Sequence, residues 1–151
     1  KEEILTKIKS AGIVGLGGAT FPAHVKLSHP PGKKADVLII NAVECEPYLT
    51  CDHQLMLEQG EEIMVGVSIL MKVLDVEKAF IGIECNKLDA VEHMSRLAQS
   101  FSGITVQPLK VQYPQGGEKQ LIEAILRRKV PSSKRKTAHR TCDDYFGKRL
   151  S

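Results

Sequence analysis

Four closely spaced glycines form the segment of this sequence that is best suited to hold an anion. Residues 12–26 read Gly-Ile-Val-Gly-Leu-Gly-Gly-Ala-Thr-Phe-Pro-Ala-His-Val-Lys. Glycine permits positive φ, and consecutive amides in such a loop can point into one concavity and bind a phosphate. Pro22 is placed to begin a short helix aimed at the same point, with Lys26 one turn later as a point charge. The composition predicts a phosphate-binding loop, with an ordinary glycine-rich surface loop as the alternative.

This loop fits neither of the two common nucleotide-binding fingerprints. A Walker loop ends in Gly-Lys-Ser/Thr, whereas Gly18 is followed by Ala19 and Thr20. The dinucleotide fingerprint Gly-x-Gly-x-x-Gly directly follows a strand. Here Thr20 occupies the place of the last glycine, and the preceding residues have the pattern of a helix.

Carboxylates and glycines follow three apolar runs that we expect to be strands. These runs are residues 36–43, 78–84 and 104–111. Ligands of open α/β sheets bind beyond the carboxyl ends of the strands. That rule predicts one crevice that collects Asn41, Glu44, Glu46, Glu84, Asn86, Tyr113 and the turn Gly116-Gly117-Glu118-Lys119. Each residue alone is more typical of a solvated loop, so the prediction depends on their joint placement.

Segments with helical periodicity separate the predicted strands. We expect helices at residues 2–11, 54–58, 61–74, 88–101 and 118–128, with Asp52 as the N-cap of the second. Alternating strands and helices predict an α/β fold with a mainly parallel sheet. Right-handed crossovers should then place helices on both faces of the sheet.

Composition restricts the class of protein. The 151 residues suit one domain, with 42% hydrophobic residues, 26% charged residues and a net charge of +3. Basic residues crowd into residues 127–149, and four Phe, three Tyr and no Trp do not suit a basic, aromatic-rich nucleic-acid surface. We find no apolar run as long as a membrane helix and no secretory signal. We therefore expect one domain at residues 1–131, followed by a basic tail at 132–151 that is disordered or non-native.

Cysteine spacing argues against a metal centre in this chain. The four cysteines, at positions 45, 51, 85 and 142, include no Cys-x-x-Cys pair of the kind that binds zinc or an iron–sulfur cluster. We expect them to be reduced, buried thiols. We interpret the five scattered histidines as surface residues; they are His24, His29, His53, His93 and His139.

Four motifs in this order carry a resemblance to a known family. They are Gly-Leu-Gly-Gly-Ala-Thr-Phe-Pro at 15–22, Leu-Ile-Ile-Asn-Ala-Val-Glu-Cys-Glu-Pro-Tyr at 38–48, Ile-Gly-Ile-Glu at 81–84 and Tyr-Pro-Gln-Gly-Gly-Glu-Lys-Gln-Leu at 113–121. Together they resemble the C subunit of the Rnf electron-transport complex, an ion-translocating ferredoxin:NAD oxidoreductase. A more distant resemblance is to the FMN- and NADH-binding subunit of respiratory complex I. The resemblance covers roughly residues 11–131.

The resemblance implies a Rossmann-like three-layer domain that binds FMN and exchanges hydride between FMN and NAD(H). It assigns the FMN phosphate and ribityl side to Gly15, Gly17, Gly18 and Lys26. It assigns the flavin to Asn41, Glu44 and Cys45, and the nicotinamide nucleotide to Phe21 and Glu46. It further assigns Phe80 and Glu84 to the same pocket, and adds Gly117 and Glu118. No residue is implied as a nucleophile or proton donor.

The resemblance also implies a setting for the chain. We expect other subunits of a membrane-bound complex as partners, at the cytoplasmic inner face of a bacterial membrane, with no membrane insertion and no nucleic acid. The 4Fe-4S clusters that accept electrons would belong to parts of the full subunit outside this chain.

Several departures from the family pattern keep a second interpretation open. Leu16 replaces the arginine of the complex I loop, Thr20 replaces its last glycine and Val43 replaces an aspartate. The downstream flavin-contacting pattern Gln/Asn-Asn-Val-x-Thr is replaced by Lys-Arg-Lys-Thr-Ala-His-Arg-Thr-Cys at 134–142. We expect the chain to fold but to hold FMN weakly and to be inactive alone. The alternative is a non-catalytic nucleotide-binding or docking module that keeps the fold without flavin.

Overall fold

Nine helices and strands alternate along the part of the chain that the structure describes. The structure is a computed structural model, and it describes residues 1–15, 20–28 and 34–129. In chain order the elements are α1 (Glu2–Ser10), α2 (Ala23–Lys26), β1 (Leu38–Ala42), α3 (Cys51–Glu58), α4 (Gly60–Leu74), β2 (Ala79–Glu84), α5 (Leu88–Ala98), β3 (Ile104–Leu109) and α6 (Glu118–Leu126). Expectations for Leu16, Gly17, Gly18, two histidines, Cys142 and the tail lie outside the described residues.

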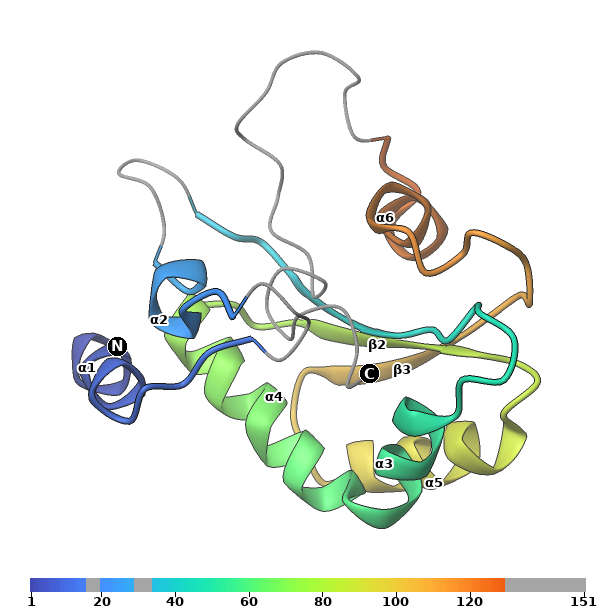
Figure 1. The fold of residues 1–151 in the computed structure, drawn as a ribbon, viewed down its shortest axis with the longest axis horizontal. Coiled ribbons are helices and arrows are strands. Elements are labelled where there is room, and N and C mark those ends of the chain that lie inside the picture. Colours follow the sequence, from blue (N-terminus) through green and yellow to red (C-terminus); the bar gives the residue numbers. More distant parts are fainter. Residues whose placement is uncertain (16–19, 29–33, 130–151) are drawn as a thin grey trace.

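The three strands form one parallel sheet in the order β1-β2-β3 (Figure 1). Leu38 pairs with Ala79, and Ala79 pairs with Ile104, so the strands start level with one another. β1 and β2 are runs of small and branched apolar residues that are buried along most of their length, as expected for a sheet covered on both faces. Pro108 is tolerated in β3, which has a single described neighbouring strand.

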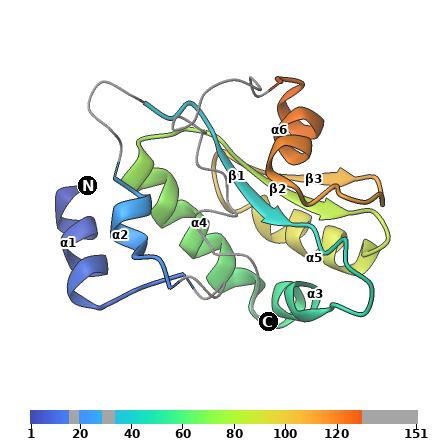
Figure 2. The same ribbon diagram turned by 45° about the horizontal axis from the view of Figure 1, so that its top comes forward.

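Alternate residues of each strand pack into two separate cores. One face, with Ile40 and Ile81, packs against α3, α4 and α5, where Met64 and Met94 are fully buried. The other face packs against α6 through a smaller core that contains Ile39, Val43, Leu109, Leu121 and Ile122. Figure 2 shows α6 on the opposite side of the sheet from α4 and α5. The predicted Rossmann-like, three-layer α/β fold is confirmed.

The helices divide unequally between the two faces. Adding parallel strands in one direction with right-handed crossovers keeps the connecting helices on one face, which accounts for α4 and α5. After β3 the chain crosses to the other face and forms α6. In open α/β sheets, ligands bind outside the carboxyl ends of the strands, at the point where the strand order reverses.

Several predicted boundaries were wrong. α3 begins at Cys51 rather than residue 54, and Asp52 lies in its first turn rather than at its N-cap, which is Thr50. Pro22 is the N-cap of α2, with an extended ψ of 123°, and not its first residue. The three strands, α5 and α6 are shorter than expected, because the apolar pattern continues into turns that leave the sheet or helix axis.

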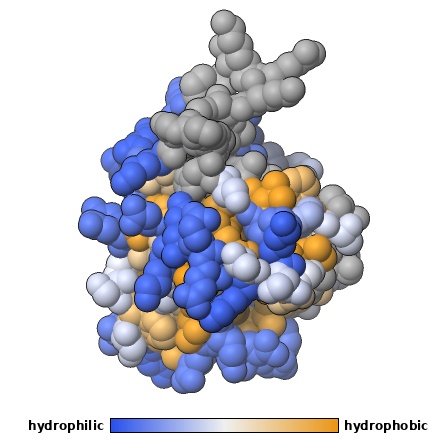
Figure 3. Space-filling model, turned by 90° about the vertical axis from the view of Figure 1, so that its left-hand side faces the viewer, coloured by the Kyte–Doolittle hydropathy of each residue, from blue (hydrophilic) through white to orange (hydrophobic). Residues whose placement is uncertain are grey.

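The surface near α1 alternates between polar and apolar side chains. Figure 3 shows mainly hydrophilic residues on this face, with apolar patches between them. Ile4, Leu5 and Ile8 of α1 turn inward onto the larger core. Among the described residues, no helix has both the length and the apolar character needed to cross a membrane.

Candidate functional site

The loops that follow β1 and β3 meet at the carboxyl edge of the sheet. The Asn41 side-chain amide donates a hydrogen bond of 3.0 Å to the carbonyl of Gly116, and the Asn41 Oδ1 accepts one of 3.2 Å from the Val43 amide. A Cβ on Gly116 would lie 3.1 Å from the Val43 carbonyl oxygen and 3.4 Å from Cys45 Sγ. Glycine is therefore needed where the second glycine turn approaches the segment after β1. The structure brings Asn41 and Cys45 close to this turn.

The residues on either side of the glycine-rich loop pair with each other as the two strands of a short hairpin. Val14 and Pro22 form an antiparallel bridge, and the Gly15 amide donates to the Phe21 carbonyl at 2.9 Å. The Ala23 amide donates to the Ile13 carbonyl at 3.0 Å. This ladder fixes both ends of the loop and leads directly into α2.

A lysine and an aromatic ring lie together at the base of this hairpin. Lys26 is only 8% exposed, and its Nζ lies 5.7 Å from the centroid of the Phe21 ring. That geometry is a cation–π contact. It holds a cation next to the glycine hairpin, where the sequence places a phosphate.

A buried ion pair joins the loops that follow β1 and β2. Lys87 Nζ donates to Glu44 Oε2 at 2.6 Å, and both side chains are buried. Glu44 also accepts hydrogen bonds from the amides of Asp52 at 2.8 Å and His53 at 3.3 Å, in the first turn of α3. Glu44 therefore supplies the acceptor that Thr50, the N-cap, does not. Its carboxylate is occupied by the protein itself.

The surroundings shift the pKa values of the two buried glutamates in opposite directions. Burial would raise the pKa of Glu44, but hydrogen bonds from Lys87 and from the Asp52 and His53 amides, with the charge of Lys87, outweigh it and lower the pKa. Burial raises the pKa of Glu84; Lys87 counteracts this in part and the Glu44 charge adds to it. Lys87 thus stabilises the charge of Glu44 more than that of Glu84.

Glu84 is an orphaned carboxyl group at the end of the central strand. It is 1% exposed, and its Oε1 has no hydrogen-bond partner among the described residues. Buried polar atoms are almost always paired. Because this carboxyl group is buried without a partner for Oε1, its charged form is disfavoured in the folded protein.

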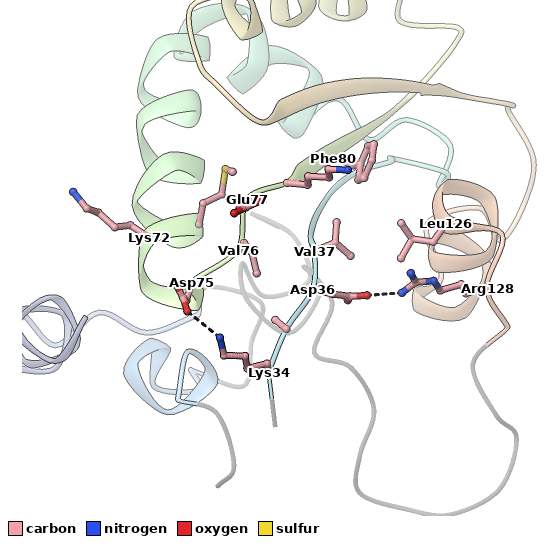
Figure 4. Close-up of a pocket in the computed structure, with 13 residues that line it drawn as sticks. Lys34, Asp36, Val37, Lys72, Asp75, Val76, Glu77, Phe80, Leu126 and Arg128 are labelled. Carbon is pink, nitrogen blue, oxygen red and sulfur yellow. Dashed lines mark hydrogen bonds and ion pairs between the residues drawn. The ribbon is translucent and has the colours of Figure 1, made fainter. Parts of the chain in front are cut away.

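Phe80 does not share a pocket with Glu84, contrary to expectation. It lies near the start of β2, and four residues of extended strand put about 13 Å between it and Glu84. Phe80 instead lines a hollow of about 770 Å³ at the amino edge of the sheet, with Val37, Val76 and Leu126. Figure 4 shows this hollow and two ion pairs at its rim, Lys34–Asp75 at 3.4 Å and Arg128–Asp36 at 2.5 Å.

The remaining predicted site residues lie around the carboxyl edge. Glu46 and Tyr113 are exposed, while Gly117 caps α6 and Glu118 lies in its first turn. The described cysteines are free thiols, but Cys51 and Cys85 are exposed and Cys45 is partly exposed, so the expectation of burial was wrong. The described histidines are partly exposed, and His53 Nε2 lies 2.8 Å from Asp89 Oδ1. Within the described ranges no cluster of His, Cys, Asp and Glu could hold a metal ion.

Comparison with known proteins assigns the chain to a family. Residues 8–142 match the family described as the Nuo51 FMN-binding domain, so the chain belongs to that family. Its relatives include the C subunit of the proton-translocating ferredoxin:NAD(+) oxidoreductase complex of Clostridium ljungdahlii, 55% identical over 133 residues, which are 87% of this chain and 28% of the relative. The C subunit of the Na(+)-translocating complex of Acetobacterium woodii is 53% identical over 131 residues, which are 87% of this chain and 30% of that relative. The resemblance stated from the motifs is confirmed.

A solved structure shares the fold. An NAD+-reducing [NiFe]-hydrogenase in the air-oxidized state matches with a TM-score of 0.67 and 25% identity, over 82% of this chain and 23% of that one. The chain therefore spans less than a third of each of these three proteins.

Sequence reasoning did not find Lys87. It lies three residues past Glu84, and its partner Glu44 is 43 positions away. A lysine just after a strand that ends in a carboxylate is the one local indication of its role. The partner follows only from the pairing of β1 with β2.

Proposed function

We propose that this chain is the FMN- and NAD(H)-binding module of the C subunit of an ion-translocating ferredoxin:NAD oxidoreductase. The observation that carries the proposal is the match of residues 8–142 to an FMN-binding domain family, joined to a cation beside a glycine hairpin. The names of its relatives supply the reaction class, since both are ferredoxin:NAD(+) oxidoreductase subunits.

The donor set fits an anionic nucleotide. Lys26 carries a positive charge at the base of the hairpin. Gly15 is the last paired residue of the first hairpin strand. We assign the FMN phosphate and ribityl chain to Gly15, Gly17, Gly18 and Lys26, because amide N–H groups and a lysine are suited to a phosphate.

The carboxyl edge would orient the two rings. When bound, FMN would accept hydride from NADH or return it, and release electrons singly. The chain's own part is positioning, because no proton donor is required of it. Asn41 fixes the Gly116 turn against the segment after β1. Glu44, held by Lys87 and by the amides of α3, would shape the Cys45–Glu46 backbone rather than offer its carboxylate to the flavin.

Glu46 and Phe21 are assigned to the nicotinamide nucleotide. Both are exposed, so a second nucleotide can reach them. A Glu46→Gln variant should change the affinity for NAD(H) while retaining FMN. Equal loss of both ligands would contradict this division of roles.

The complex supplies the partners and the location in this proposal. Further subunits would hold the module at the cytoplasmic face of a bacterial membrane, and iron–sulfur clusters elsewhere in the full subunit would take the electrons. The exposed Cys51 and Cys85 are not placed to do so within the described residues.

Flavin retention tests the proposed function directly. The chain, and a longer natural polypeptide that contains a downstream Asn-Asn-Val-x-Thr segment, would be reconstituted with FMN, desalted and measured by visible absorbance. We expect little flavin on the chain, near one equivalent on the longer polypeptide, and anaerobic bleaching of that flavin by NADH. A folded longer polypeptide without flavin would contradict the proposal and favour a docking module.

A further inference from the structure

A turn just beyond the carboxyl end of β1 presents a fully exposed aromatic ring. The Leu49 amide donates to the Glu46 carbonyl at 3.4 Å, which closes a turn with Pro47 and Tyr48 at its centre. Tyr48 has a φ of 64°, in the left-handed region. Turns with proline at the first central position and positive φ at the second ordinarily carry glycine or asparagine at that second position.

Tyrosine at this position strains the backbone of the free protein, and nothing in the fold offsets that strain. A bulky residue in the left-handed region is sterically strained. The residue is fully exposed, so its ring buries no apolar surface that would offset the strain. Glycine would relieve the strain, and the free fold gains nothing from the ring. Strained residues of this kind cluster at ligand-binding sites.

We propose that Tyr48 is a stacking platform for the base of a purine nucleotide, whose ribose hydroxyls meet Glu46 in the same turn. This inference rests on the proposed function and adds a base-recognition residue to its second nucleotide. The turn lies at the edge of the sheet where ligands of such folds bind. A carboxylate suits the ribose diol, and an aromatic face suits any base. One four-residue turn thus carries both elements of nucleoside recognition at adjacent points.

Tyrosine fluorescence provides a local readout, because the chain contains three tyrosines and no tryptophan. The protein would be titrated with AMP and with ribose 5-phosphate, which lacks the base, and affinities would be measured by calorimetry. Tyr48→Gly removes the ring and relieves the strain, while Tyr48→Phe keeps the ring. Arg127→Gly is the matched control, since Arg127 ends α6 with a φ of 54°.

We expect Tyr48→Gly to melt at a higher temperature than the wild type and to bind AMP at least about tenfold more weakly. Tyr48→Phe should keep wild-type affinity but lose most of the fluorescence quenching by AMP. Arg127→Gly should also melt higher, with AMP affinity unchanged. Ribose 5-phosphate should bind weakly and equally to all four proteins.

Two results would overturn the inference. One is unchanged AMP affinity in Tyr48→Gly, and the other is wild-type protein that binds AMP no better than ribose 5-phosphate. FMN retention by the longer polypeptide separates the two proposals. If FMN is retained but AMP affinity is the same in Tyr48→Gly and the wild type, the stacking role fails and the proposed function stands. If AMP binding depends on Tyr48 but no FMN is retained, the stacking role stands and the flavin assignment fails.

Discussion

At the scale of single residues, the Glu44–Lys87 pair is a buried ion pair at the carboxyl edge, with Lys87 Nζ 2.6 Å from Glu44 Oε2. It joins the loops after β1 and β2 inside a buried environment, and it satisfies the first turn of α3 at the same time. Removing one member of a buried pair is costly because the other charge is left unpaired. The pair therefore governs local geometry as well as stability.

Lys87→Met should lower the free energy of unfolding by about 3 kcal/mol, because Glu44 would remain buried without its cation. The double variant Lys87→Met with Glu44→Gln should lose clearly less than the sum of the two single variants, since it buries no unpaired charge. Chemical denaturation of all four proteins measures this cycle. Additive losses would show that the two side chains do not interact in solution.

Glu84 predicts an unusual dependence of stability on pH. Its raised pKa means that the folded state binds this proton more tightly than the unfolded chain does. Protonation of Glu84 therefore favours the folded state at pH values below the ordinary pKa of glutamate. This stabilisation is lost as the pH rises through the raised pKa. Glu84→Gln should raise the melting temperature relative to the wild type, and the gain should grow as the pH rises above the ordinary pKa of glutamate.

Glu44→Gln is the matched control for that experiment. The pKa of Glu44 is lowered, so its contribution is present above the unfolded pKa and is lost as pH falls through the folded value. The loss of melting temperature caused by Glu44→Gln should therefore become smaller as the pH is lowered. If both variants changed in the same direction with pH, the opposite pKa shifts described for the two glutamates would be wrong.

At the scale of elements, two glycines in regular structure have opposite reasons for their lack of a side chain. A Cβ on Gly82 in β2 would lie 2.9 Å from Leu109 Cδ1 and 3.1 Å from Leu121 Cδ1, beneath α6. A Cβ on Gly66 in α4 would meet nothing within 4 Å. Gly82 is required by packing, whereas Gly66 only weakens its helix.

Gly82→Ala should destabilise the protein by about 1–3 kcal/mol, because α6 must shift or Leu109 of β3 and Leu121 of α6 must change rotamer. Gly66→Ala should stabilise it by about 0.5–1 kcal/mol through helix propensity alone. Thermal and chemical unfolding of the two variants tests the assignment of α6 to the second face. A neutral Gly82→Ala would mean that α6 does not pack there.

The elements also show which features the sequence could predict. Short continuous apolar runs identified all three strands, and apolar residues at a period of 3.6 identified five of the helices, because burial imposes these patterns locally. The cap of α3 was mispredicted because its acceptor is Glu44, which lies outside the helix and accepts from the amides of Asp52 and His53. Lys87 was missed for the same reason, since its partner is defined by strand pairing.

Phe80 is different, because the sequence contained enough information to place it correctly. A residue near the start of a parallel strand lies at the amino edge, and the ligand edge is the carboxyl one. The family resemblance assigned Phe80 to the flavin pocket without regard to the direction of the strand. The direction of β2 places it instead in the amino-edge hollow (Figure 4).

At the scale of the whole molecule, the two edges of the sheet have separate characters. The amino edge carries a hollow rimmed by the Lys34–Asp75 and Arg128–Asp36 ion pairs. The carboxyl edge carries the buried glutamates, the turn at Gly116 and the exposed tyrosines. Nucleotide ring binding is therefore assigned to the carboxyl edge. The proposed phosphate ligand Lys26 lies in α2, which is beside the C-terminal end of α4 in Figures 1 and 2.

The affinity for FMN of a Lys26→Met variant tests this central claim most directly. Methionine keeps an unbranched apolar stem at the buried position beside Phe21 but removes the charge. In the longer flavin-retaining polypeptide, we expect FMN affinity to fall by roughly tenfold to a hundredfold, with little change in melting temperature. Lys72→Met, an exposed lysine at the amino-edge hollow, should bind FMN like the wild type. Wild-type affinity in Lys26→Met, or an equal loss in Lys72→Met, would contradict the account.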